Sequence, residues 1–148
     1  ILVTGRYPEG EKYGGTDRLS YATISKFRDF INQEIPNYRH IIVEGDRFFR
    51  APDVEWVLDN HDAKVYILTV DLKEETRRHK ERNDAQDPTW LQGRRSVISN
   101  ILTNFALMGR VEVRSNQTLE DSANIKKEIL NIINKHRSGV SSSNSVRL

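Results

Sequence analysis

Apolar residues in this chain of 148 residues follow two different spacings. Short continuous apolar runs are typical of buried strands, and they occur at residues 1–4, 41–43, 65–70 and 111–113. Apolar residues three and four positions apart predict amphipathic helices, and this spacing occurs at about residues 20–35, 54–58, 97–105 and 118–137. Strands that alternate with helices in this way predict an α/β fold, in which helices cover both faces of a parallel sheet.

The polar segments between these runs add a loop and a charged helix to the expected fold. Residues 6–15 are rich in glycine and predict a long loop, which in a compact domain usually has a function. Residues 71–82 predict a helix with little apolar face, and a polar break follows at 83–88. Thr118 and Asp121 resemble a capping box that opens the last helix.

Composition narrows the class of protein. Hydrophobic residues make up 36% and charged residues 30% of the chain, and the formal net charge is +2, so a polyanionic partner is permitted but not required. The absence of cysteine excludes disulfides and zinc–thiolate sites and suits a reducing cytoplasm. No apolar run has the ~20 residues of a membrane span. We expect one domain over residues 1–137 and a disordered Ser-rich tail at 138–148.

Two acidic residues, Glu44 and Asp46, follow the second apolar run, with Gly45 between them. Ligand crevices in open α/β sheets lie outside the carboxyl ends of the strands. Strand alternation predicts both carboxylates on one side, roughly 7 Å apart. One carboxylate can then hold Mg²⁺, directly or through water, while the other accepts a proton from an attacking hydroxyl. The alternative is a strand end whose acids are only solvated.

A glycine pair at residues 14–15 leads into a second polar motif. Backbone amides at a helix start attract anions, and Thr16, Arg18 and Ser20 can add donors to a phosphate or a nucleobase. Asp17 can accept from a base edge or orient Arg18. The alternative is a flexible turn followed by a helix cap.

The third candidate is a basic cluster, which consists of Arg77, Arg78, Lys80, Arg82, Arg94 and Arg95. On a helix, Glu74 can pair with Arg78, and Arg78 shares a face with Arg82. A charged helix, a polar break and further arginines match the requirements of a lid that clamps phosphate, so we expect a lid over residues 73–95. The alternative is a solvated charged face.

A phosphate-binding loop of the form Gly-x-x-x-x-Gly-Lys-Ser/Thr does not occur in these 148 residues. In the nearest approach, Gly5 and Gly10 have the right spacing, but Glu11 stands where the lysine is needed and Lys12 comes one position late. We interpret this stretch as a substrate loop. The chain also begins with Ile1 in an apolar run, so we expect a further segment upstream.

Three strings carry a specific resemblance: Gly5-Arg6-Tyr7, GTDRLS at residues 15–20 and EGDRF at 44–48. Together they resemble the bacteriophage P-loop kinases that act on 5-hydroxymethyluracil in DNA during thymidine hypermodification, over residues 1 to about 116. The resemblance implies a three-layer P-loop fold, ATP and Mg²⁺ as cofactors, and transfer of the γ-phosphoryl group to the base hydroxymethyl. It also implies a phosphate-binding βα unit of about 30 residues, whose strand lies centrally beside residues 41–43.

The resemblance implies roles for individual residues. Glu44 and Asp46 would lie near the acceptor hydroxyl and the metal, with Asp46 as the magnesium residue. The arginines implied as lid and phosphate residues are Arg77, Arg78 and Arg82, with Arg94 and Arg95 as further candidates. The residues implied on the substrate side are Tyr7, Thr16, Asp17, Arg18 and Arg47. The aromatic candidates to stack on an extruded base are Tyr7, Tyr13 and Phe48.

Two other functions stay open on the sequence alone. A kinase for free nucleosides or nucleoside monophosphates would use the same strand-end acids and lid arginines. A noncatalytic DNA-binding module, derived from a kinase that lost its loop, would show no ATP turnover at all. A DNA kinase is distinguished by acceptor choice and by activity that falls steeply with salt. The expected localisation is cytoplasmic, in the host cell if the protein is encoded by a phage.

Overall fold

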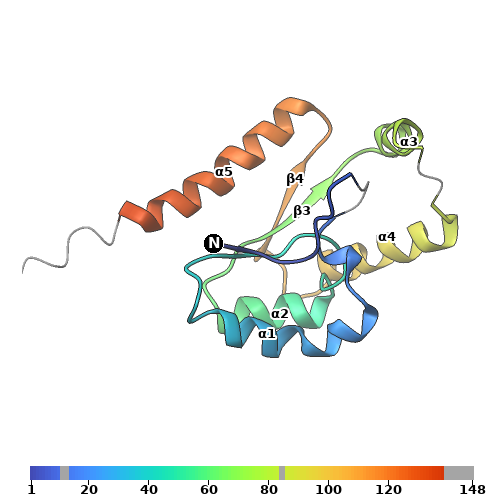
Figure 1. The fold of residues 1–148 in the computed structure, drawn as a ribbon. Helices are drawn as coiled ribbons and strands as arrows, with labels where there is room; N and C mark the ends of the chain where they lie inside the picture. Colours follow the sequence, from blue (N-terminus) through green and yellow to red (C-terminus); the bar gives the residue numbers. More distant parts are fainter. Residues whose placement is uncertain (11–13, 84–85, 139–148) are drawn as a thin grey trace, which may run out of the picture.

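The computed structural model describes residues 1–10, 14–83 and 86–138 as a mixed α/β structure (Figure 1). The strands are β1 (Leu2–Val3), β2 (Ile41–Ile42), β3 (Val65–Thr69) and β4 (Val111–Ser115). The α-helices are α1 (Phe27–Glu34), α2 (Ala51–Asn60), α3 (Leu72–Glu81), α4 (Pro88–Leu102) and α5 (Leu119–Ser138). Two short 3-10 helices, η1 (Thr16–Arg18) and η2 (Tyr21–Lys26), precede α1. The expected stacking residue Tyr13 and the expected tail beyond residue 138 lie outside the described residues.

The strands form two separate parallel pairs. Strand β1 pairs with β2, with Leu2 opposite Ile41, and β3 pairs with β4 from Val65 opposite Val111 to Thr69 opposite Ser115. The predicted α/β class and the parallel pairing are therefore confirmed. Within the described residues, β2 and β3 are not hydrogen-bonded to each other, so the strands do not join into one sheet. Each of these two strands has a hydrogen-bonded neighbour on one edge only.

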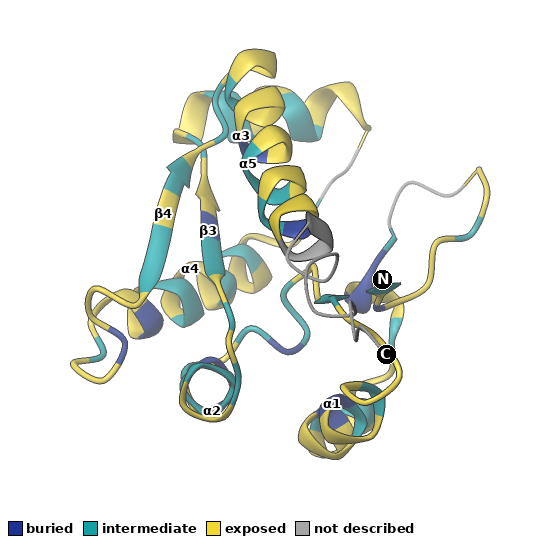
Figure 2. Cartoon of the chain, turned by 90° about the vertical axis from the view of Figure 1, so that its left-hand side faces the viewer, coloured by how far each residue is buried: buried dark blue, intermediate teal, exposed yellow. Residues whose placement is uncertain are grey.

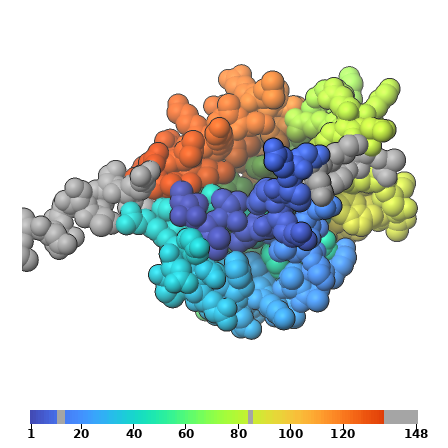
Figure 3. All heavy atoms as spheres, viewed as in Figure 1, coloured from blue at the N-terminus to red at the C-terminus, as the bar shows by residue number. Residues whose placement is uncertain are grey.

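An apolar hollow of about 340 Å³ lies between the two strand pairs. Its apolar lining comes from β2, β3 and α5 and consists of Ile42, Leu68, Ile125, Ile129, Leu130 and Ile133. In the view of Figure 2, β3 and β4 lie on one side of α5 and the N-terminal residues lie on the other. In Figure 3 the N-terminal residues cross the middle of the molecule below α5.

Two buried clusters hold these elements together. The first contains Val54, Ile67, Ile101 and Leu107, and joins α2 and α4 to β3. The second contains Phe27, Ile31 and Phe48, with Ile41 of β2 and two residues of α2 packed against it. On the opposite face of β3, the hydroxyl of Tyr66 donates to Glu128 of α5 at 3.1 Å. Helices therefore lie on both faces of the β3–β4 pair.

The positions at which the helices start are set by capping side chains more than by the spacing of apolar residues. Asp71 and Asp87 accept from backbone N–H groups at the starts of α3 and α4. The predicted capping box is confirmed, because Thr118 and Asp121 each accept the other's backbone N–H through the side chain. Among the described helices, none is long and apolar enough to cross a membrane.

Two predicted helices differ from the structure in their extent or continuity. The helix expected at 97–105 begins earlier, at Pro88, because proline is well suited to the first turn. It ends at Leu102, and Phe105 is exposed beyond it rather than packed in the core. The helix expected from Ser20 is divided into the 3-10 helix η2 and α1, and Ser20 does cap the first of these.

Candidate functional site

The two polar motifs of the sequence, at residues 14–20 and 44–48, lie against each other. Thr16 donates from its hydroxyl to the carbonyl oxygen of Glu44 at 2.6 Å, and its backbone N–H donates to the same oxygen at 3.3 Å. The Thr16 side chain is fully buried. Its hydroxyl therefore fixes the end of the second strand segment and does not face solvent, which differs from the substrate-side position that the resemblance implies.

Asp17 organises the turn that follows Glu44. Its Oδ1 atom accepts from the backbone N–H groups of Asp46, at 2.8 Å, and of Arg47, at 3.2 Å. The Arg47 guanidinium donates in return to the Asp17 carbonyl at 2.9 Å. Gly45 makes this turn possible with a φ of +98°, because a Cβ atom there would lie 2.6 Å from the Thr16 hydroxyl.

Glu44 points away from Asp46, toward the N-terminal loop. Its carboxylate accepts from the Tyr7 hydroxyl at 3.0 Å and lies over Gly15, where an added Cβ would clash with it at 1.7 Å. Burial, together with the hydrogen bond to Glu44, raises the pKa of Tyr7 to about 12. Tyr7 therefore stays protonated and positions the Glu44 carboxylate.

Asp46 lies in a carboxyl pair with Asp17 that carries an unusual affinity for a proton. Burial is the main cause and the neighbouring Asp17 carboxyl the second, and together they raise the pKa of Asp46 to about 6. Arg94 opposes this shift through an ion pair with the Asp46 carboxylate, and also donates to the Asp46 carbonyl at 3.1 Å. Such a pair also attracts a divalent cation, which removes the repulsion between two carboxylates.

The predicted geometry of Glu44 and Asp46 was wrong. Strand β2 ends at Ile42, and the backbone turns at Gly45. Strand alternation therefore does not extend to Asp46, and the two carboxylates have different neighbours: Tyr7 and Gly15 for Glu44, and Asp17 and Arg94 for Asp46. The sequence prediction fails because it assumed an extended backbone through a glycine with positive φ.

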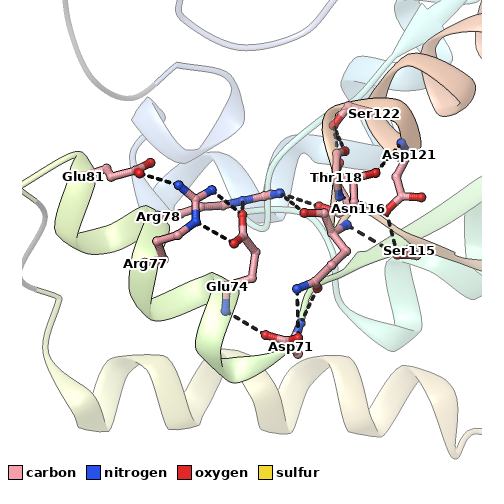
Figure 4. A network of polar contacts seen from close by, with 11 residues as sticks. Asp71, Glu74, Arg77, Arg78, Glu81, Ser115, Asn116, Thr118, Asp121 and Ser122 are labelled. Carbon is pink, nitrogen blue, oxygen red and sulfur yellow. Dashed lines mark hydrogen bonds and ion pairs between the residues drawn. The ribbon is translucent and has the colours of Figure 1, made fainter.

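The arginines of α3 form a network with acidic residues and with the loop after β4 (Figure 4). Arg77 and Arg78 both donate to Glu74 at 2.6 Å, and these hydrogen bonds lower the pKa of Glu74 to about 2. Arg78 also donates to the carbonyl oxygens of Asn116, at 2.6 Å, and Gln117, at 3.1 Å. The predicted pairing of Glu74 with Arg78 is confirmed. The bonds from Arg78 to Asn116 and Gln117 anchor α3 to the carboxyl end of β4.

A polar hollow of about 470 Å³ lies beside this network. Its lining comes from α3 and from the start of α5, and includes Arg77, Arg78, Arg82, Gln117, Thr118 and Ser122. The hollow is at the carboxyl ends of β3 and β4, where α/β sheets bind their ligands. Sequence analysis missed Gln117, whose amide group contacts Asp71 at 2.8 and 3.0 Å. The available signal was a polar stretch, residues 114–118, between the apolar run at 111–113 and the start of the last helix.

Two neighbouring arginines of α4 connect the two candidate regions. Arg94 pairs with Asp46 after β2, and Arg95 donates to Glu75 of α3 at 2.7 Å. The carboxyl ends of β2 and β3 therefore open on the same rim of the molecule. Arg18, the last residue of η1, is exposed beside this rim.

The carboxyl pair of Asp46 and Asp17 suits a magnesium ion that shares its ligands with a substrate better than a metal ion held by protein side chains alone. Within the described ranges, no three histidine, aspartate or glutamate side chains gather in a way that could hold a metal ion. Mg²⁺ does not require such a cluster, because proteins usually hold it with one or two carboxylates together with substrate phosphates and water. Asp46 and Asp17 match this donor set.

Comparison of the chain with models of protein families, with curated proteins and with solved structures finds no match.

Proposed function

We propose that this chain is the larger part of an ATP-dependent, Mg²⁺-dependent P-loop-type kinase that phosphorylates the 5-hydroxymethyl group of 5-hydroxymethyluracil in DNA. The observation that carries the proposal is the apolar hollow between β2 and β3, next to a rim of acids and arginines. The resemblance of the GTDRLS and EGDRF strings to phage DNA kinases supplies the acceptor.

The hollow has the character of an unfilled strand position. Ile42 on one side and Leu68 on the other face it, and each belongs to a strand that has one unpaired edge within the described part of the chain. A strand between them would pair with both at the usual ~4.8 Å spacing, and would give a five-stranded parallel sheet. A phosphate-binding strand in this central position would present its loop to the rim where Asp46 and Arg94 lie.

The rim supplies the groups that phosphoryl transfer requires. Asp46, with Asp17 beside it, would hold Mg²⁺, which neutralises charge on the phosphates of the nucleotide. Glu44, held by Tyr7, would accept the proton of the base hydroxymethyl group. Arg78 and the other α3 arginines would contact the phosphates from the polar hollow. A base in duplex DNA would have to be extruded to reach this rim.

The test uses the full-length protein and [γ-³²P]ATP. We expect label to enter an oligonucleotide that contains 5-hydroxymethyluracil and not its thymine counterpart. Glu44→Gln and Asp46→Asn should each lower turnover by orders of magnitude without loss of the fold. Near-normal turnover in both variants would refute the assigned roles. Transfer to a free nucleoside monophosphate alone would favour the nucleotide kinase, and DNA binding without turnover would favour a noncatalytic module.

The strand position has its own test. Hydrogen exchange at the amides of β2 and β3 is compared between the 148-residue chain and a longer form that carries a phosphate-binding βα unit. A strand inserted between β2 and β3 would slow exchange on both. Unchanged exchange on both strands in an active longer form would contradict the proposed sheet.

A further inference from the structure

Two segments far apart in the sequence, residues 18–28 and 47–56, run side by side on the surface below the rim. Contacts between them that involve aromatic rings or charged groups include Tyr21 with Arg47, Phe27 with Phe48, and Arg28 with Asp53. The phenyl rings of the middle contact stack at 4.5 Å and are buried. We call the surface along these two segments the arginine seam.

The two segments of the arginine seam together carry a net positive charge. Residues 18–28 contain three basic residues and no acidic one, and residues 47–56 contain two of each. The seam therefore has a formal charge of +3, whereas the whole chain has +2. A surface with this excess attracts polyanions.

The acidic partner of the seam faces inward and the arginines face outward. The Asp53 side chain is only 5% exposed, and it accepts from Arg28 at 3.2 Å and from Arg50 at 2.9 Å. The side chains of these two arginines are 44% and 46% exposed. One buried carboxylate thus orients two guanidinium groups, which keep exposed donors and lose little further entropy when they bind a phosphate.

Tyr21 gives the arginine seam an aromatic platform at the end of the seam where Arg47 lies. Tyr21 as a residue is 68% exposed, and the Arg47 guanidinium lies 3.8 Å from the centre of its ring. Arg47 is held in place by its bond to the Asp17 carbonyl. An exposed ring beside a fixed arginine is the arrangement on which unpaired bases stack in proteins that bind single strands.

We infer that the arginine seam binds single-stranded DNA, with Arg28, Arg47 and Arg50 on the phosphates and one base stacked at Tyr21. The choice of DNA over other polyanions rests on the proposed function. The seam leads directly to the acid pair, because Arg47 follows Asp46 in the chain. A strand bound along the seam would therefore deliver a neighbouring nucleotide to the proposed transfer site.

The test measures binding of fluorescent oligothymidine by anisotropy, without ATP or Mg²⁺. At about 50 mM salt, Arg47→Ala and Arg50→Ala should each weaken binding about five- to tenfold and reduce the salt slope by about 0.7. Tyr21→Ala should weaken binding at least about fivefold. The matched control is Arg110→Ala, which removes an ion-paired arginine before β4 and should bind like the wild type.

Further measurements separate loss of contact from loss of fold. Arg50→Lys should restore most of the affinity lost in Arg50→Ala, and thermal melts by circular dichroism should show the fold intact. On duplex DNA, the Tyr21→Ala defect should be absent. The inference is overturned if the wild type does not bind oligothymidine, or if the seam variants bind as tightly as Arg110→Ala. It also fails if Tyr21→Ala weakens duplex binding equally.

These outcomes are independent of the kinase assay. Oligothymidine binding that depends on the seam, in a full-length protein without phosphotransferase activity, would leave the inference standing and remove the proposed function. Phosphoryl transfer to DNA that is unchanged in Arg47→Ala, Arg50→Ala and Tyr21→Ala would leave the proposed function standing and overturn the inference.

Discussion

Replacement of Asp46 by asparagine should produce a protein that is inactive and yet more stable at neutral pH. The pKa of Asp46 is raised to about 6 by burial and by Asp17. The unfolded chain therefore releases this proton first, near the ordinary value of 3.8. Between about pH 4 and pH 6 the folded protein holds more protons than the unfolded chain, so its stability falls as the pH rises.

The size of the effect follows from the shift. A pKa of about 6 against 3.8 corresponds to about 3 kcal/mol at ~1.4 kcal/mol per tenfold change. The Asp46 side chain is 28% exposed, and solvent screening reduces this figure, so we expect about 1 to 2 kcal/mol. The side chain introduced by Asp46→Asn resembles the protonated carboxyl, because its amide can donate to Asp17 where the shared proton lay.

Urea unfolding at pH 4, 5, 6 and 7 measures this directly. From pH 4 to pH 7, the free energy of unfolding of the wild type should fall by about 1 to 2 kcal/mol. Asp46→Asn should not show this fall. The exposed carboxylate of Asp59 provides a control, and Asp59→Asn should keep the wild-type pH dependence. Equal pH dependence in wild type and Asp46→Asn, or an Asp46→Asn protein less stable than wild type at pH 7, would show that the carboxyl pair is not strained.

Three further predictions concern the site and the core. Arg94→Ala removes the cation that lowers the pKa of Asp46, so the fall in stability should extend above pH 6 in the same urea series. Gly45→Ala should cost about 2 to 4 kcal/mol in urea unfolding, because φ is +98° and the added Cβ clashes; Gly93→Ala, with open space around it in α4, should be neutral or stabilising by up to about 1 kcal/mol. Ile101→Ala, at the centre of the first cluster with 1% exposure, should cost about 2 to 5 kcal/mol in a thermal or urea melt.

The elements of the fold were largely predictable, because their signals are local. The apolar runs at 41–43 and 65–70 contain β2 and β3, and the charged segment after Asp71 forms α3. The split of the strands into two pairs was not predictable from periodicity, since pairing depends on which edges meet in space. Only the resemblance of the sequence strings to a kinase family implied that a further strand belongs beside residues 41–43.

The sequence named the residues of the candidate site but did not predict how they are arranged. The two motifs do meet, yet no spacing rule indicates that Thr16 is buried under Glu44 or that Asp17 holds the turn at Gly45. Those contacts depend on a positive φ, which the sequence suggests only by the presence of glycine. The arginine seam was missed because Arg28 and Asp53 are 25 residues apart, and neither belongs to a recognisable motif.

The two buried clusters share one element, the helix α2. Val54 belongs to the cluster around β3, whereas Trp56 and Val57 pack on the cluster around α1, and the neighbouring residues Phe48 and Phe49 divide in the same way. The 148-residue chain should therefore melt in two steps, with the half that contains β1, β2 and α1 opening first and α2 as the hinge between them. A strand that filled the space between β2 and β3 would merge the two steps into a single cooperative transition.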